Sequence, residues 1–133
     1  MRKLILDTSF LSSYLNKSDV NHEKALDVYA QIVQNEQDSV DLLVSVNVLI
    51  ELLVGIKKLG KRKIKQVLEF VDVFADQVVD IGLGDIGEFG EYLDYSKVNI
   101  TPIDQYLLFL AKKYDAEILT FDKELLRKNL AQN

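Results

Sequence analysis

The stretch Leu4-Ile5-Leu6-Asp7-Thr8-Ser9 decides the predicted fold, because it has the pattern of a buried strand that stops at an aspartate. A second stretch of this kind, Ile118-Leu119-Thr120-Phe121-Asp122, lies near the end of the chain. In a parallel α/β sheet the carboxyl ends of the strands lie along one edge, where ligands bind. We therefore expect Asp7 and Asp122, which are far apart in sequence, to meet at that edge.

Segments typical of strands and of helices alternate along the chain. Strands are predicted at residues 3–6, 42–46, 78–81 and 117–120. Helices are predicted at residues 8–16, from Asn21 or His22, at 47–58, after Gly60, around 89–93, at 102–114 and at 123–129, with Thr8 or Ser9 as the first cap. This alternation predicts an α/β fold whose central, mostly parallel sheet of about four to five strands has helices on both faces.

Length and composition limit the possible classes of protein. The 133 residues, 48% of them hydrophobic, suit one domain over 1–133 and leave no room for a second. The longest apolar stretch, Val40 to Ile56, is interrupted by polar residues and is too broken for a membrane span. The first residues show no small-residue cleavage site. We expect a soluble, cytoplasmic protein.

The side chains available for chemistry are restricted. The chain has no cysteine, which excludes disulfides, thiol nucleophiles and cysteine-bound zinc. Its single histidine cannot form a histidine-rich metal centre. Any chemistry must therefore use carboxylates, hydroxyls and amines.

Two further acids accompany the aspartates at the strand ends. Glu51 is the one charge in an apolar helix that we expect to be largely buried, so it needs a cationic partner, a metal or a cleft. Asp104 lies in the first turn of a helix that opens with Thr101 and Pro102. Simpler roles exist, because Asp104 suits the helix dipole and Asp122 suits a helix cap.

The four acids together fit one chemistry. Mg²⁺ and Mn²⁺ prefer oxygen ligands and are commonly held by a few carboxylates plus substrate phosphate. Crowded carboxylates repel one another unless a cation is present. A pair of such ions activates a water and stabilises the leaving oxygen of a phosphodiester. The reaction class that the acids indicate is phosphodiester hydrolysis.

A basic run interrupts an otherwise acidic chain, whose formal net charge is -5. Its position at the start of a predicted helix opposes the helix dipole, which favours a role in binding phosphates. A solvated helix face is the alternative interpretation. The run consists of Lys57, Lys58, Lys61, Arg62, Lys63 and Lys65.

The order of these motifs resembles PIN-domain ribonucleases, particularly VapC-type toxins of toxin-antitoxin pairs. The resemblance rests on 6–9 at the first strand end, Glu51, Asp104 opening a helix, and 119–122 at the last strand. It implies an RNA substrate, a homodimer, and an antitoxin whose tail blocks the cleft. It also implies that Mg²⁺ or Mn²⁺ is bound by Asp7, Glu51, Asp104 and Asp122, with a nearby hydroxyl from Thr8, Ser9 or Thr120.

Two other interpretations of the sequence compete with the nuclease interpretation. The segment Gly82-Leu83-Gly84-Asp85-Ile86-Gly87 has the G-x-G-x-x-G spacing of a dinucleotide-binding turn. Pro102 argues against it, because it interrupts the strand that would have to end at the ribose-binding acid. A catalytically inactive PIN-like interaction module is the second alternative, although such a module would have lost an acid and all four are present.

Overall fold

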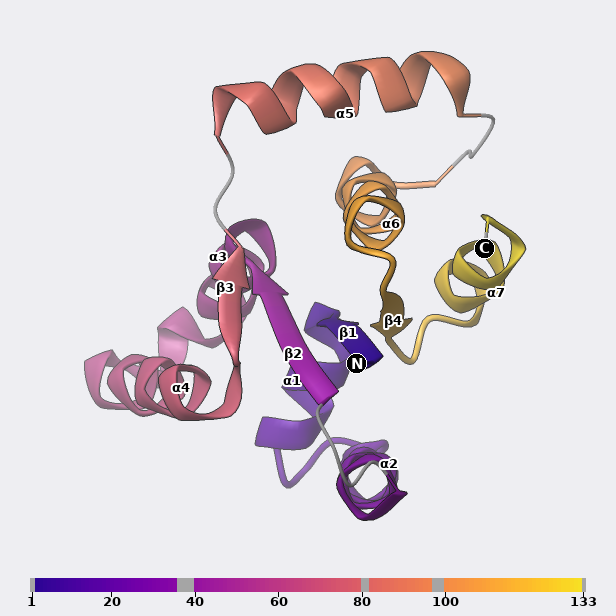
Figure 1. Cartoon of the computed structure of the whole chain (residues 1–133). Coiled ribbons are helices and arrows are strands. Elements are labelled where there is room, and N and C mark those ends of the chain that lie inside the picture. Colours follow the sequence, from indigo (N-terminus) through magenta and orange to yellow (C-terminus); the bar gives the residue numbers. More distant parts are fainter. Residues whose placement is uncertain (1, 36–39, 80–81, 97–99, 133) are drawn as a thin grey trace.

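The fold is built around a sheet of four parallel strands. The computed structural model describes residues 2–35, 40–79, 82–96 and 100–132. The strands are β1 (Arg2–Leu6), β2 (Val40–Ser45), β3 (Gln77–Val79) and β4 (Glu117–Leu119), in the spatial order β3-β2-β1-β4 (Figure 1). The predicted parallel sheet is confirmed, although residues 80–81 of the third predicted strand lie outside the described residues. Leu6 pairs with Leu119, so the first and last strands end side by side.

Helices connect the strands and cover both faces of the sheet. In Figure 1, α5 and α6 lie above the strands, α2 lies below them, and α1 overlaps β1 and β2 in this view. No helix of the described residues has the length and apolarity needed to cross a membrane. The helices are α1 (Thr8–Leu15), α2 (His22–Asn35), α3 (Val46–Ile56), the short 3₁₀ helix η1 (Lys57–Leu59), α4 (Lys61–Phe74), α5 (Leu83–Tyr95), α6 (Pro102–Tyr114) and α7 (Lys123–Gln132).

The core explains why these segments hold together. The last three residues of β1 are almost completely buried, as expected for a central parallel strand covered on both faces. Helix α6 packs a continuous apolar segment, Tyr106 to Ala111, into the same core. A cluster of aromatic rings around Tyr14 joins α1 to α2 through Tyr29 and to α4 through Phe70 and Phe74.

Helix α3 corrects one expectation from the sequence. The sequence predicts a largely buried helix around Glu51, and this prediction is wrong. Only Val48 and Leu52 of α3 are buried, whereas Ile50 and Val54 are each 57% exposed. A helix at the surface contacts the sheet along one stripe only, so apolar residues on the opposite side stay exposed despite the apolar sequence.

The outer edge of β4 is closed by a side chain from α7. Asn129 is completely buried, and its Oδ1 accepts a hydrogen bond of 3.0 Å from the backbone N–H of Ile118, the middle residue of β4. A buried N–H without a partner would cost about 1–3 kcal/mol. Asn129 therefore supplies the acceptor that a fifth strand would otherwise provide.

Replacing Asn129 tests this edge contact. Asn129→Ala should lower the free energy of unfolding by about 1–3 kcal/mol, because the N–H of Ile118 loses its acceptor. The measurement is urea denaturation, with Gln66→Ala on the exposed face of α4 as the control. A variant as stable as the control would show that water or a backbone shift replaces the contact.

Candidate functional site

The four acids come from four separate segments and line one cavity. Asp7 follows β1, Glu51 projects from α3, Asp104 lies in the first turn of α6, and Asp122 precedes α7. All four line a cavity of about 480 Å³, together with Thr8, Ser9, Ser12, Thr101 and Ile103. None of these described lining residues is basic, so the cavity has a strongly negative lining.

Asp7 is held in place by hydrogen bonds from both ends of the chain. It is only 6% exposed. Its Oδ1 accepts from the backbone N–H of Thr8 at 2.8 Å, which makes Asp7 the cap of α1 in place of the predicted Thr8 or Ser9. Its Oδ2 accepts from the hydroxyls of Ser9 at 2.9 Å and Thr120 at 2.7 Å. A carboxylate has about four acceptor positions, so one position of Asp7 is left for a ligand.

The hydroxyls of Ser9 and Thr120 have fixed directions. Each oxygen also accepts a backbone N–H, from Phe121 at 3.1 Å and from Asp122 at 3.0 Å respectively. Because each hydroxyl donates its single proton to Asp7, the 3.1 Å contact between the two oxygens lacks a proton to share. These hydrogen bonds connect the turn after β4 to the end of β1.

The hydroxyl of Thr8 differs from its neighbours. Its Oγ1 is buried and has no hydrogen-bond partner in the structure. Buried hydroxyls are nearly always satisfied, so an orphan beside an acidic cavity indicates a missing water or ligand. Of the three predicted hydroxyls, Thr8 is therefore the one free to contact a bound group.

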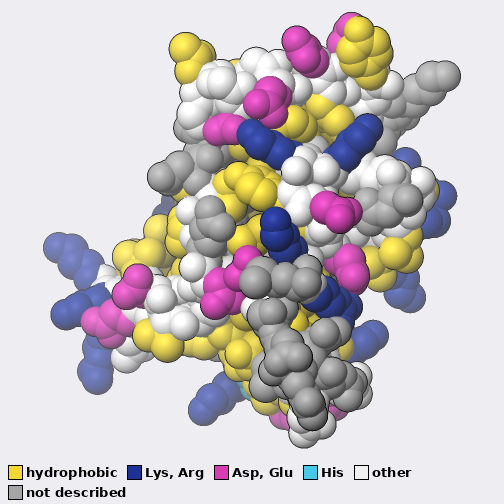
Figure 2. Space-filling view, in the orientation of Figure 1, with side chains coloured by type: hydrophobic (Ala, Val, Ile, Leu, Met, Phe, Trp, Pro, Cys, Tyr) yellow, Lys and Arg dark blue, Asp and Glu magenta, His cyan; other side chains and the backbone are white. Residues whose placement is uncertain are grey.

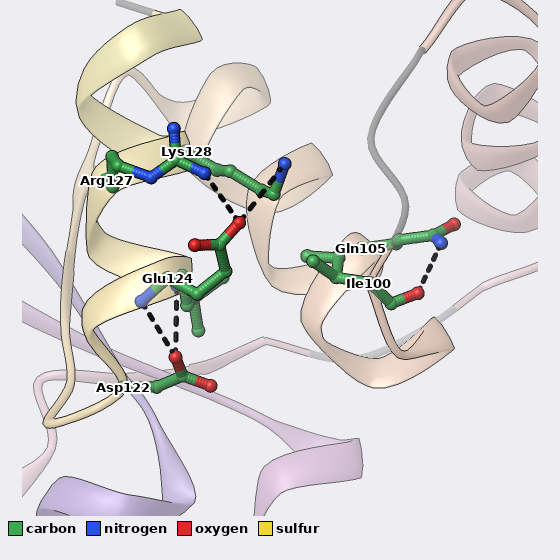
Figure 3. A network of polar contacts seen from close by, with 7 residues as sticks. Ile100, Gln105, Asp122, Glu124, Arg127 and Lys128 are labelled. Carbon is green, nitrogen blue, oxygen red and sulfur yellow. Dashed lines mark hydrogen bonds and ion pairs between the residues drawn. The ribbon is translucent and has the colours of Figure 1, made fainter.

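Asp122 has the capping role that the sequence offered as its simpler interpretation, and it also lines the cavity. Its Oδ1 accepts from the backbone N–H groups of Glu124 at 3.0 Å and Leu125 at 3.2 Å (Figure 3). Figure 3 also shows Glu124 paired with Arg127 and Lys128, at 2.6 and 3.5 Å. These two basic residues are thus drawn toward Glu124 on α7, and the described contacts leave Oδ2 of Asp122 unbonded.

Asp104 shows the electrostatic cost of gathering these acids. Burial raises the pKa of its carboxyl above the ordinary value of 3.8, and the charges of Asp7, Asp122 and Glu51 raise that pKa further. The hydroxyl of Thr101, which caps α6, acts in the opposite direction. Asp104 is therefore close enough to the other three carboxylates for their charges to act on it.

The residues present fit a hard divalent cation by their chemistry. Carboxylate oxygens and a free hydroxyl are the donors that Mg²⁺ and Mn²⁺ prefer. The described residues contain no group of three or more acidic or histidine side chains already arranged to hold an ion. The residues that would hold such an ion are the four acids that line the cavity, Asp7, Glu51, Asp104 and Asp122.

The basic run lies beside the cavity, and one of its members enters a neighbouring groove. Lys63 is partly buried, and it lines a second cavity that also contains Glu51 and Thr8. The other five members are exposed, and Lys65 lies 4.0 Å from Glu69. Figure 2 shows basic side chains, in dark blue, projecting at the left, where α4 lies in Figure 1.

Comparison with known proteins identifies the fold. A protein-family comparison matches residues 4–129 to the PIN domain. The chain belongs to the PIN-domain family. No curated protein sequence is similar enough to this PIN domain to be matched.

Solved structures agree with this PIN-domain assignment. VapC20 from Mycobacterium tuberculosis, a toxin that cleaves the sarcin-ricin loop, has a TM-score of 0.73 and 17% identity over 94% of each chain. FitAcB from Neisseria gonorrhoeae gives 0.69 and 20% identity, covering 95% of this chain and 92% of the other. VapBC2 from Rickettsia felis, bound to a DNA fragment from its promoter, has a TM-score of 0.60 and 21% sequence identity. The match covers 94% of this chain and 92% of the other. At these identities the likeness shows the fold.

The glycine-rich segment has a structural role in this PIN domain. Gly82 precedes α5, and its backbone N–H donates to Oδ2 of Asp85 at 2.9 Å. Asp85 in turn binds Lys113 of α6 at 2.6 Å. A carboxylate already occupies the helix start where a dinucleotide-binding turn would hold pyrophosphate, and Asp104 begins a helix instead of ending a strand.

Sequence reasoning missed two polar residues of the cavity, Ser12 and Thr101. Ser12 stands one helical turn after Thr8, so the spacing along α1 was the available signal. Thr101 was recognised only as a helix cap. Neither residue type alone indicates a functional site.

Removing the charge of Asp104 tests the crowding of carboxylates. A raised pKa means that the folded state holds the proton more tightly than the unfolded chain does. The resulting stability is present below pH 3.8 and is lost as pH rises through the raised pKa. In EDTA at pH 7, Asp104→Asn should therefore be more stable than the wild type in urea denaturation, and the difference should shrink on acidification.

Asp85 provides a control, because its pKa is shifted in the direction opposite to that of Asp104. Hydrogen bonds from Lys113 and Gly82 lower the pKa of its carboxyl. Its stabilising contribution is present above pH 3.8 and is lost as pH falls through the lowered pKa. Asp85→Asn should therefore be less stable than the wild type at pH 7. If both substitutions change the free energy of unfolding at pH 7 in the same direction, the electrostatic explanation is ruled out.

Proposed function

We propose that the protein is a metal-dependent endoribonuclease that hydrolyses RNA phosphodiester bonds, acting in the cytoplasm as the toxin of a toxin-antitoxin pair. The observation that carries the proposal is the convergence of Asp7, Glu51, Asp104 and Asp122 on one cavity without basic lining residues. The PIN-domain family and the VapC-type structural neighbours support the same activity.

The side chains have distinct tasks in this proposal. The buried and fully oriented Asp7 provides a fixed oxygen ligand, while Glu51, Asp104 and Asp122 complete the ligand set. A bound Mg²⁺ or Mn²⁺ would lower the pKa of the attacking water and stabilise the leaving oxygen. We assign the unpartnered hydroxyl of Thr8 to contact with a bound group, and Ser9 and Thr120 hold Asp7 through hydrogen bonds.

The basic run supplies the attraction for RNA that the net charge of -5 lacks. We assign phosphate contacts to its members, since a local concentration of cations attracts a polyanion despite the overall charge. The run comprises Lys57, Lys58, Lys61, Arg62, Lys63 and Lys65.

Metal-dependent cleavage of RNA tests the proposal. The wild type should cleave a mixed-sequence single-stranded RNA with Mn²⁺ or Mg²⁺ and should be inactive in EDTA. Asp104→Asn should lower kcat by about a hundredfold or more, because it removes one charge that holds the activating ion. Asp27→Asn, an exposed acid on α2, is the matched control.

Two results would contradict the nuclease. Cleavage that persists in EDTA or in Asp104→Asn would refute the assigned chemistry. Absence of cleavage, combined with absence of Mn²⁺ binding in calorimetry, would favour the inactive interaction module instead.

A protein partner is part of the proposal. The structural neighbours include VapBC2 and FitAB, each solved with a DNA fragment. We propose that this protein likewise has a cognate antitoxin, whose tail covers the acidic cavity and blocks access of RNA.

A homodimer would cover the exposed apolar residues of two helices. On α5, Leu83, Ile86 and Leu93 are exposed at 86%, 54% and 41%, whereas Phe89 and Tyr92 are partly buried against the core. On α3, Ile50 and Val54 are also exposed. Apolar patches of this kind on a soluble protein mark association surfaces.

The double variant Ile86→Glu/Leu93→Glu should convert a dimer into a monomer in analytical ultracentrifugation, because buried charges oppose association. Leu130→Glu, an exposed leucine on α7, is the control and should leave the dimer intact. A monomeric wild type, or a dimer that survives the double substitution, would contradict the proposed interface.

A further inference from the structure

A second cavity continues from the acidic cavity along the surface. Its volume is about 750 Å³, and it shares Thr8, Ser12 and Glu51 with the acidic cavity. It runs between α1 and α3 and reaches the start of α4 at Lys63. The two cavities therefore adjoin at these three residues, and we call the second cavity, where it extends beyond Glu51, the exit groove.

A glycine in the wall of the exit groove has no structural reason to be a glycine. Gly55 lies in the last turn of α3, and a Cβ atom built on it would meet nothing within 4 Å. Among the described residues, only Gly60 is a glycine with positive φ, so backbone conformation does not require Gly55 either. A glycine in a helix costs roughly 0.5–1 kcal/mol relative to alanine. A side chain at this position would extend into open space beside the groove.

The charge of the exit groove differs from that of the acidic cavity. Beyond Glu51 the charged lining residues are Lys17, in the turn after α1, and Lys63 on α4. Neither makes an ion pair with a described acid, so both ammonium groups are available to a ligand. Two unpaired cations that line the groove beyond Glu51 favour an anionic occupant there.

The remaining surface of the groove suits a nucleotide chain. Leu15 and Ile56 provide apolar contact for a ribose or base. Asn16 also lines the groove, and its Oδ1 accepts from the backbone N–H of Ser18 at 3.0 Å. That contact uses the amide oxygen of Asn16, and its NH₂ group remains a donor for phosphate or base.

We propose that the RNA strand leaves the acidic cavity through the exit groove, with Lys63 and Lys17 binding a phosphate that flanks the scissile one. This inference rests on the proposed nuclease function and adds the path of the substrate. It singles out Lys63 from the other members of the basic run and adds Lys17, which lies outside that run.

The comparison of Lys63→Ala with Lys112→Ala tests the phosphate contact. Lys112 is exposed on α6, near the end of that helix remote from Asp104, and it lies outside both cavities. Loss of a phosphate contact should lower kcat/KM for mixed-sequence single-stranded RNA. It should also make the slope of log kcat/KM against log salt shallower by about one. Lys112→Ala should keep the wild-type slope.

Filling the groove provides a second and independent test. Gly55→Gln should fold normally, because glutamine favours helices and its side chain enters open space. It should reduce RNA cleavage by about a hundredfold through displacement of the strand, while Mn²⁺ binding in calorimetry stays unchanged. Gly84→Gln on α5, where a Cβ also meets nothing, is the matched control.

The outcomes separate this inference from the proposed function. If the wild type does not cleave RNA, the nuclease proposal fails, and fluorescence anisotropy with the same RNA still compares Lys63→Ala with Lys112→Ala. If both groove variants cleave or bind RNA like their controls, the exit path is wrong. If they retain RNA activity but lose affinity for an acidic peptide, the groove is a protein-docking site and the inference is overturned.

Discussion

The buried charge of Asp7 is the constraint on which the geometry of the sheet edge depends. An ionised carboxylate this deeply buried would cost several kcal/mol without hydrogen-bond donors. The donors come from Thr8, Ser9 and Thr120, and therefore from both the first and the last strand ends. Satisfying one charge thus positions the turn after β4, and that turn carries Asp122 to the cavity.

The gathering of acids in one cavity has an electrostatic cost to the stability of the fold. Burial and three neighbouring carboxylates oppose ionisation of Asp104, and a protein without a ligand to bind gains nothing from this crowding. A carboxyl pKa perturbed by burial and by neighbouring charges is typical of sites that bind a ligand. Burial of the apolar core, from β1 to α6, offsets this loss of stability.

Sequence patterns located the strand ends and the acids because these signals are local. An apolar run followed by aspartate fixes both the element and the position of its polar end. The exposure of α3 escaped prediction because the sequence of Ile50 and Val54 does not reveal which side of a helix the fold covers. The roles of Thr120 and Asn129 escaped because each side chain has its partner on another segment. Hydrogen bonds between distant segments depend on the topology of the fold, and a single sequence does not show which segments become neighbours.

The closure of β4 by Asn129 also determines how copies of this protein can come together. An open strand edge is a template on which another chain can add a strand, and such edges are common starting points for aggregation. Here the outward N–H of Ile118 is already satisfied from within the molecule. A sheet that runs continuously from one molecule into the next is therefore blocked at this edge. Association at β4 would first require α7 to detach, which places a folding barrier in front of strand exchange.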